Sequence, residues 1–159
     1  MDDSSSSYFD TVSEVFESWD TIKRIPDYEE VVGLALFDKM FESAPDAWGI
    51  FRWRKEDFAK KDPQCVAFAK KFVRMLDLAV HMLGPEMDIV EQQMYDLGKQ
   101  HQRYGVMPKH FFSMGKALES TLANILGRDF TYKTREAWKD VFHFMSTSMI
   151  MGASGSCEA

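Results

Sequence analysis

Cysteine is scarce in this sequence, and neither cysteine suggests a crosslink or a metal site. The chain has two, Cys65 and Cys157, and the second lies in a tail rich in glycine and serine. Neither has neighbours with the spacing of metal ligands, and two such cysteines do not form a disulfide framework. We therefore expect reduced thiols in a reducing compartment.

An excess of basic residues and a long apolar run are also missing. The 19 lysines and arginines are outnumbered by 25 aspartates and glutamates, for a net charge of −6, whereas a nucleic-acid surface needs clustered positive charge. No run of about 18 apolar residues is present to cross a membrane. The acidic, serine-rich start MDDSSSSYFD lacks the features of a secretory signal. We expect a cytoplasmic protein with neither nucleic acid nor membrane as partner.

Apolar and aromatic residues, by contrast, are plentiful. Of 159 residues 45% are hydrophobic, including 13 Phe, 4 Trp and 11 Met, and this length is typical of one domain with a single core. We place that domain at residues 10–152. The polar ends, residues 1–9 and 153–159, have little to bury and are expected to be disordered tails.

Hydrophobic periodicity predicts helices throughout the domain. Apolar residues recur at helical spacing, and no segment shows the alternation of a strand. Proline and glycine mark several predicted ends, such as Pro26 and Gly105. The sequence therefore predicts an all-α fold of about six to eight helices, with the clearest signals at residues 11–25, 27–43, 63–83, 89–101, 108–125 and 131–149.

A histidine ends one of these apolar stripes. Val90, Met94, Leu97 and His101 share one helical face, so the imidazole points toward the core. Two interpretations remain open at this point, a packed and hydrogen-bonded core histidine or a metal ligand. Zinc is not favoured, because the other histidines show no paired ligand spacing, whereas a haem needs one protein nitrogen and apolar walls. Those other histidines are His81, His110 and His143.

Several segments resemble globins in the same order along the chain. LGKQHQRYGV resembles the proximal-histidine segment, and PDYEEVVGLALFDKMFESAPDAWGIF the stretch that ends in a phenylalanine against the haem. DPQCVAFAKKFVRMLDLAV resembles the distal helix and EAWKDVFHFMSTSMIMG the last helix. The resemblance covers roughly residues 12–152. Over this range the chain is similar to neuroglobin-like globins and to single-domain globins of protists and invertebrates. It implies a globin fold around haem b, with His101 as the iron ligand and Phe51 as a haem contact.

The distal position departs from the usual globin pattern. The resemblance places Phe68 where most globins have a histidine or glutamine, with Phe72 one turn onward and Phe37 opposite. An alignment shifted by one residue would place Ala67 or Ala69 at this position, and neither side chain has a hydrogen-bond donor. Hydrogen bonds to charged partners contribute about 1.5–3 kcal/mol, so we expect faster oxygen release and a relative preference for carbon monoxide. His81 is about 20 Å farther along the helix, so we also expect five-coordinate iron at rest.

The resemblance implies further cofactor contacts. Lys71 matches the propionate-pairing lysine, with an ordinary solvated lysine as the alternative, and as a sixth ligand it would first lose its proton at a cost of about 5 kcal/mol. Arg52 and Arg54 flank Phe51. They are expected either to contact the propionate edge of the haem or to be ordinary surface charges. The carbonyl of Leu97 is expected to accept from the His101 ring. Val106 and Phe112 complete the predicted haem contacts.

The leading functional hypothesis is a globin that reversibly binds O2, CO or NO. Oxygen binding or transport, gas sensing and redox sensing all fit this hypothesis, and we do not expect an enzyme. One alternative is an NO dioxygenase or peroxidase that works with a separate reductase. Another is a haemless helical interaction module. The chain is expected to be a monomer or homodimer.

Overall fold

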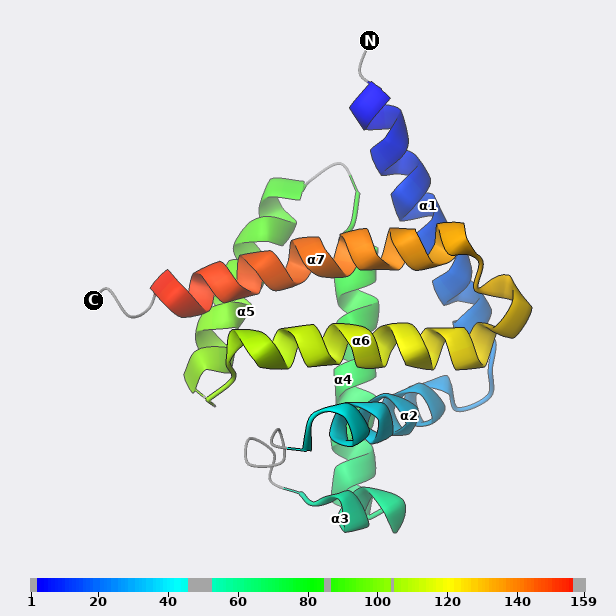
Figure 1. Ribbon diagram of the computed structural model, residues 1–159, viewed down its shortest axis with the longest axis vertical. Coiled ribbons are helices and arrows are strands. Elements are labelled where there is room, and N and C mark those ends of the chain that lie inside the picture. Colours follow the sequence, from blue (N-terminus) through cyan, green and yellow to red (C-terminus); the bar gives the residue numbers. More distant parts are fainter. Residues whose placement is uncertain (1–2, 46–52, 85–86, 104, 156–159) are drawn as a thin grey trace.

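The architecture is a bundle of seven α-helices with one short 3₁₀ segment, in a computed structural model that describes residues 3–45, 53–84, 87–103 and 105–155. No strand occurs in these ranges, which confirms the all-α fold of about six to eight helices predicted from periodicity. The elements follow the chain in Figure 1 as α1 (Asp3–Lys23), α2 (Tyr28–Ser43), α3 (Lys55–Ala59), α4 (Pro63–His81), α5 (Met87–Arg103), α6 (Pro108–Leu126), η2 (Gly127–Asp129) and α7 (Tyr132–Gly155).

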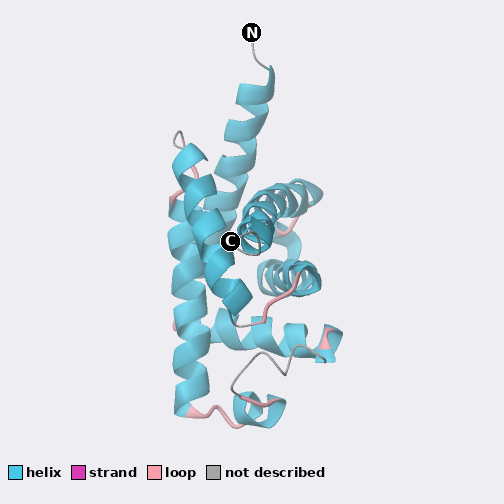
Figure 2. Ribbon diagram, turned by 90° about the vertical axis from the view of Figure 1, so that its left-hand side faces the viewer, coloured by secondary structure: helices cyan, strands magenta, loops and turns pink. Residues whose placement is uncertain are grey.

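The long helices cross rather than run in one direction. Helices α6 and α7 lie side by side, and α4 runs nearly perpendicular to both (Figure 1). Helix α2 packs against α4 and α6, while α5 packs against α7. Both side views show the first turns of α1 projecting beyond the other helices (Figures 1 and 2). The crossings leave one end of α4 close to α2 and α3, where a second group of apolar residues gathers.

The main core is built around two tryptophans. Trp19 and Trp138 are almost fully buried, and their rings meet edge to face with centroids 5.9 Å apart. The indole of Trp138 donates to the hydroxyl of Ser18 at 2.8 Å, so its polar atom is satisfied inside the core. This contact joins α1 to α7, far apart in sequence.

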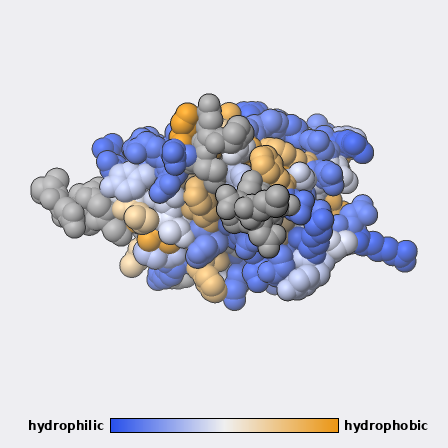
Figure 3. Space-filling model, turned by 90° about the horizontal axis from the view of Figure 1, so that it is seen from above, coloured by the Kyte–Doolittle hydropathy of each residue, from blue (hydrophilic) through white to orange (hydrophobic). Residues whose placement is uncertain are grey.

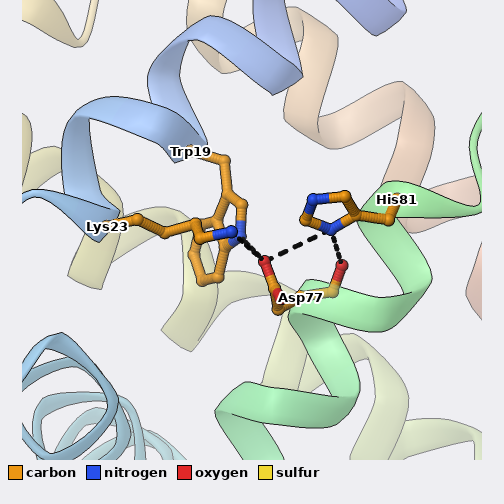
Figure 4. A network of polar contacts seen from close by, with 4 residues as sticks. All are labelled: Trp19, Lys23, Asp77 and His81. Carbon is orange, nitrogen blue, oxygen red and sulfur yellow. Dashed lines mark hydrogen bonds and ion pairs between the residues drawn. The ribbon is translucent and has the colours of Figure 1, made fainter.

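A carboxylate joins α1 to α4 at the edge of this core (Figure 4). Trp19 Nε1 donates to Asp77 Oδ1 at 2.7 Å, and Lys23 Nζ lies 3.0 Å from the same oxygen. His81 Nδ1 lies 3.4 Å from that oxygen and 2.7 Å from the Asp77 backbone carbonyl. Burial would raise the pKa of Asp77, but the hydrogen bonds from Trp19 and Lys23, with the charge of His81, hold it below its ordinary value.

The predicted tails are shorter than expected. Helix α1 already begins at Asp3, and α7 continues to Gly155. The polar start is joined to the rest of the molecule because Tyr8 packs against the main core and its hydroxyl donates to the Gly84 carbonyl at 3.0 Å. Residues 1–2 and 156–159 lie outside the described ranges.

The face of the molecule that is seen from above is mainly hydrophilic (Figure 3). On the face in Figure 3, apolar residues form scattered patches between hydrophilic ones, as is usual for globular proteins. In the part of the chain that the structure describes, no helix combines the length and the apolar character that crossing a bilayer requires.

Candidate functional site

The site is built around His101 in the last turn of α5. This helix buries Val90 and Met94 on one face, and the same face continues to the half-buried Leu97 and His101. The imidazole Nδ1 lies 2.8 Å from the Leu97 carbonyl oxygen, four residues earlier, as the resemblance to globins implied. Because a carbonyl can only accept, Nδ1 carries the proton of the neutral ring, and Nε2 has the lone pair that can bind a metal.

The chain turns sharply after His101, and the residues after the turn form a hydrogen bond with the His101 backbone. Gly105 has a φ of 83°, a left-handed conformation that favours glycine. Val106 N–H donates to the His101 carbonyl at 3.2 Å, and the Val106 side chain is half-buried. The turn thus satisfies one backbone carbonyl at the end of α5.

The ring that contacts His101 comes from α6. The centroids of Phe111 and His101 are 5.8 Å apart, and Phe111 is buried. Phe112, the predicted haem contact, is 67% exposed, with Lys116 Nζ 4.7 Å from its ring centroid. The apolar stripe of α6 passes through position 111, so the helical periodicity favoured Phe111 over its neighbour.

The three distal phenylalanines of the prediction do meet. Phe37 on α2 is fully buried, and its ring centroid lies 5.4 Å from those of Phe68 and Phe72 on α4. Other rings that the sequence did not single out join them. We call the whole set the phenylalanine cluster; it comprises Phe37, Phe41, Phe58, Phe68, Phe72 and Trp53.

Phe41, Phe58 and Trp53 are the members that the sequence analysis did not place in the site. Phe58 stacks on Phe37 with a centroid distance of 5.4 Å, and the Trp53 ring lies 4.9 Å from that of Phe68. Both belong to a segment that showed no periodicity, because α3 has only five residues. The signal that could have found them is the density of aromatic residues in that segment.

Electrostatics in the phenylalanine cluster favour uncharged groups. Cys65 is fully buried beside the rings, and burial raises the pKa of its thiol to about 11. The thiol is therefore neutral at physiological pH. Over the ranges that the structure covers, no three His, Cys, Asp or Glu residues are placed to hold a metal ion together. A metal at His101 would have to arrive with ligands of its own, as iron in a porphyrin does.

The remaining predicted residues are spread around the molecule. Lys71 is exposed on α4, and Arg54 is exposed at the start of α3, where its backbone N–H donates to Asp57 Oδ2 at 2.8 Å. Phe51 and Arg52 lie outside the described residues. His81 is held by Asp77 at the α1–α4 contact, away from the phenylalanine cluster's members on the same helix.

Comparisons with known proteins identify the family. The chain is similar to neuroglobin from Tetraodon nigroviridis, 28% identical over 141 residues, and to neuroglobin from Dissostichus mawsoni, 25% identical; each match covers 85% of both chains. Its fold is similar to that of a hexacoordinated heme protein from an anhydrobiotic tardigrade, solved at pH 4, with a TM-score of 0.77. That match has 23% identity and covers 91% of this chain and 93% of the other. The sequence model of the globin family matches residues 34–149. Because this match spans most of the sequence, the chain belongs to the globin family.

Proposed function

We propose that this chain binds haem b through Nε2 of His101 and uses it to bind O2, CO or NO reversibly. The observation that carries the proposal is the hydrogen bond between His101 Nδ1 and the Leu97 carbonyl, which fixes the ring and its tautomer. When bound, the haem supplies an iron with a coordination position for a small gas. The related neuroglobins and the membership of the globin family support this cofactor.

The phenylalanine cluster would give the gas site its selectivity. The rings of Phe37, Phe68 and Phe72 are apolar and carry no hydrogen-bond donor. A ligand that becomes polar on binding thus lacks the roughly 1.5–3 kcal/mol that a donor to a charged partner supplies. An apolar ligand loses nothing there, so the site favours CO relative to O2.

We further propose that the iron is five-coordinate at rest. Phe68 and Phe72 carry no metal-binding atom, and His81 is engaged with Asp77. Lys71 is solvated on the outside of α4, and holding it deprotonated costs about 5 kcal/mol from its reference pKa. We assign Lys71 instead to the propionate edge of the haem.

Absorption spectra of the ferric, ferrous and CO-bound protein test the proposal. Wild-type protein given haem should show a Soret band and a five-coordinate ferrous spectrum. His101→Gly should lose this spectrum and recover it when free imidazole is added, since imidazole can replace the missing side chain. His143→Gly, which removes an exposed histidine of α7, is the matched control and should resemble wild type.

Three other experimental results would each favour a different interpretation. A wild-type protein with no Soret band would leave the haemless interaction module as the function. A sharp six-coordinate ferrous spectrum would refute the proposed distal site while leaving haem binding in place. Rapid turnover of NO or peroxide with an added reductase would support the enzymatic alternative.

A further inference from the structure

Helix α5 is held against α7 by an unusually close contact. The two helices make the most extensive interhelical contact in the part of the chain that the structure describes, and they cross in Figure 1 near the C-terminal half of α7. A buried glycine lies on each side of this contact, Gly98 on α5 and Gly152 on α7.

The two glycines act reciprocally. A Cβ atom on Gly98 would overlap the backbone carbonyl of Met149, and a Cβ atom on Gly152 would overlap the backbone carbonyl of Tyr95. Tyr95 and Gly98 are slightly less than one helical turn apart, and so are Met149 and Gly152. The helices therefore touch backbone to backbone over a turn, and rotation of a side chain cannot relieve an added methyl group.

This contact adjoins the groups that orient His101. Leu97, whose carbonyl lies 2.8 Å from His101 Nδ1, directly precedes Gly98. His101 follows Gly98 by less than one turn and sits on the same rigid helix end. A displacement of α5 at Gly98 therefore moves the imidazole and its hydrogen-bond acceptor together.

We propose that Gly98 and Gly152 are positioning residues for the iron ligand. By letting α5 and α7 meet backbone to backbone, they set the position and direction of the His101 imidazole. They thereby set the strength of its bond to the haem iron. The inference rests on the proposed haem function, and the competing explanation is that both glycines serve packing alone.

The test compares substitutions that crowd different helix pairs. Gly98→Ala and Gly152→Ala crowd the same contact from opposite sides. Gly115→Ala is the matched control, because Gly115 lies on α6 and the atoms nearest to its Cβ, the first at 2.6 Å, all belong to the Phe142 ring of α7. Gly84→Ala, with nothing within 4 Å of its Cβ, gives the effect of the residue change alone.

The readouts separate positioning from stability. In the haem-free protein, ¹⁵N NMR reports the His101 tautomer and the exchange of its Nδ1 proton with water, and urea unfolding reports stability. In the haem-loaded protein, resonance Raman reports the iron–histidine stretching band, and transfer of haem to a scavenger protein reports its release. We expect Gly98→Ala and Gly152→Ala to shift the band in the same direction and to speed haem release roughly 10- to 100-fold, the scale for groups that orient a metal ligand.

The Gly115→Ala control shows what a loss of packing alone does to the measurements. Gly115→Ala should lower stability yet leave the His101 signals and the stretching band at their wild-type positions. The inference would be overturned if Gly98→Ala and Gly152→Ala lowered stability but left the His101 NMR signals and the iron–histidine stretching band at their wild-type positions. If the crowded variants fail to fold, a chain ending at Met151 removes Gly152 without creating an overlap. This shortened chain should exchange the His101 Nδ1 proton with water faster than wild type. An unchanged exchange rate would overturn the inference.

Failure of the haem proposal is visible separately. A wild-type protein that takes up no haem refutes the proposed function, while the NMR comparison in the haem-free chain still tests whether the glycines position the His101 ring.

Discussion

His101 and Phe68 place different demands on their surroundings. His101 needs an acceptor for one ring nitrogen, which the helix itself provides through the Leu97 carbonyl. Phe68 needs only apolar neighbours, and the rings of Phe37 and Trp53 lie within 5.4 Å and 4.9 Å of it. The proposed metal ligand is thus oriented by its own helix, whereas the proposed gas-side wall is assembled from three segments of the chain.

A donor at position 68 should retain oxygen. Phe68→Gln places an amide in the phenylalanine cluster, and a hydrogen bond of about 1.5–3 kcal/mol corresponds to a roughly 10- to 100-fold slower release of O2. CO release should change far less. Flash photolysis and stopped-flow measurements check this, with Phe68→Leu as the control that changes size without adding a donor. Equal slowing of both gases would contradict the electrostatic explanation.

The buried thiol should be inert in the folded protein. Burial raises the pKa of Cys65 to about 11, so little reactive thiolate forms near neutral pH. In a Cys157→Ser background, a thiol reagent should react with Cys65 only after denaturant is added. Rapid labelling of the native protein at pH 8 would show that the site opens without unfolding.

At the scale of elements, the start of α4 depends on one side chain. Asp62 Oδ1 accepts from the backbone N–H groups of Gln64 at 2.9 Å and Cys65 at 3.4 Å, with Pro63 as the first helical residue. Asp62→Ala should lower the free energy of unfolding by about 1 kcal/mol. Urea denaturation measures it, and Asp62→Asn, which can still accept, should lose less.

The α1–α4 contact should make stability depend on pH. Because the pKa of Asp77 is lowered in the folded state, its contribution is present above the unfolded value of about 4 and is lost as pH falls through the native value. Asp77→Asn should reduce the free energy of unfolding by about 1–3 kcal/mol at neutral pH. The difference from wild type should shrink in acid.

Unfolding curves at neutral pH and at pH 3 measure this difference. Asp140→Asn, at an exposed carboxylate of α7, is the control and should unfold like wild type at both values. A gap between wild type and Asp77→Asn that stays constant into acid would show that the carboxylate's charge is not what joins the two helices.

For the whole molecule, haem should act as a stabilising ligand. A group that binds only the folded chain adds about 2.7 kcal/mol at a concentration one hundred times its Kd. The midpoint of thermal unfolding should therefore rise with added haem in wild type and much less in His101→Gly. Equal gains in both proteins would show that His101 is not the principal attachment.

Most of the helical framework could be predicted because its signal is local. The stripe through Val90, Met94 and Leu97 indicates α5, and Pro63 marks the start of α4. The N-terminal segment was missed because its ordering depends on a distant partner, the bond from Tyr8 to the Gly84 carbonyl. Composition alone does not reveal such a partner.

By itself, the sequence determined that the chain is helical, that it has the globin pattern, and that His101 ends an apolar face four residues after a carbonyl that can orient it. The helices and the apolar face follow from the 3.6-residue repeat, which depends on neighbours along one helix. The globin pattern and the acceptor at Leu97 follow from the resemblance of the segments to globins. Only the tertiary structure decided that the Phe111 ring contacts His101, that Phe58 and Trp53 join Phe37 and Phe68, and that Gly98 touches α7. Those outcomes depend on how close two helices far apart in sequence can come, and backbone contact and ring packing set that distance.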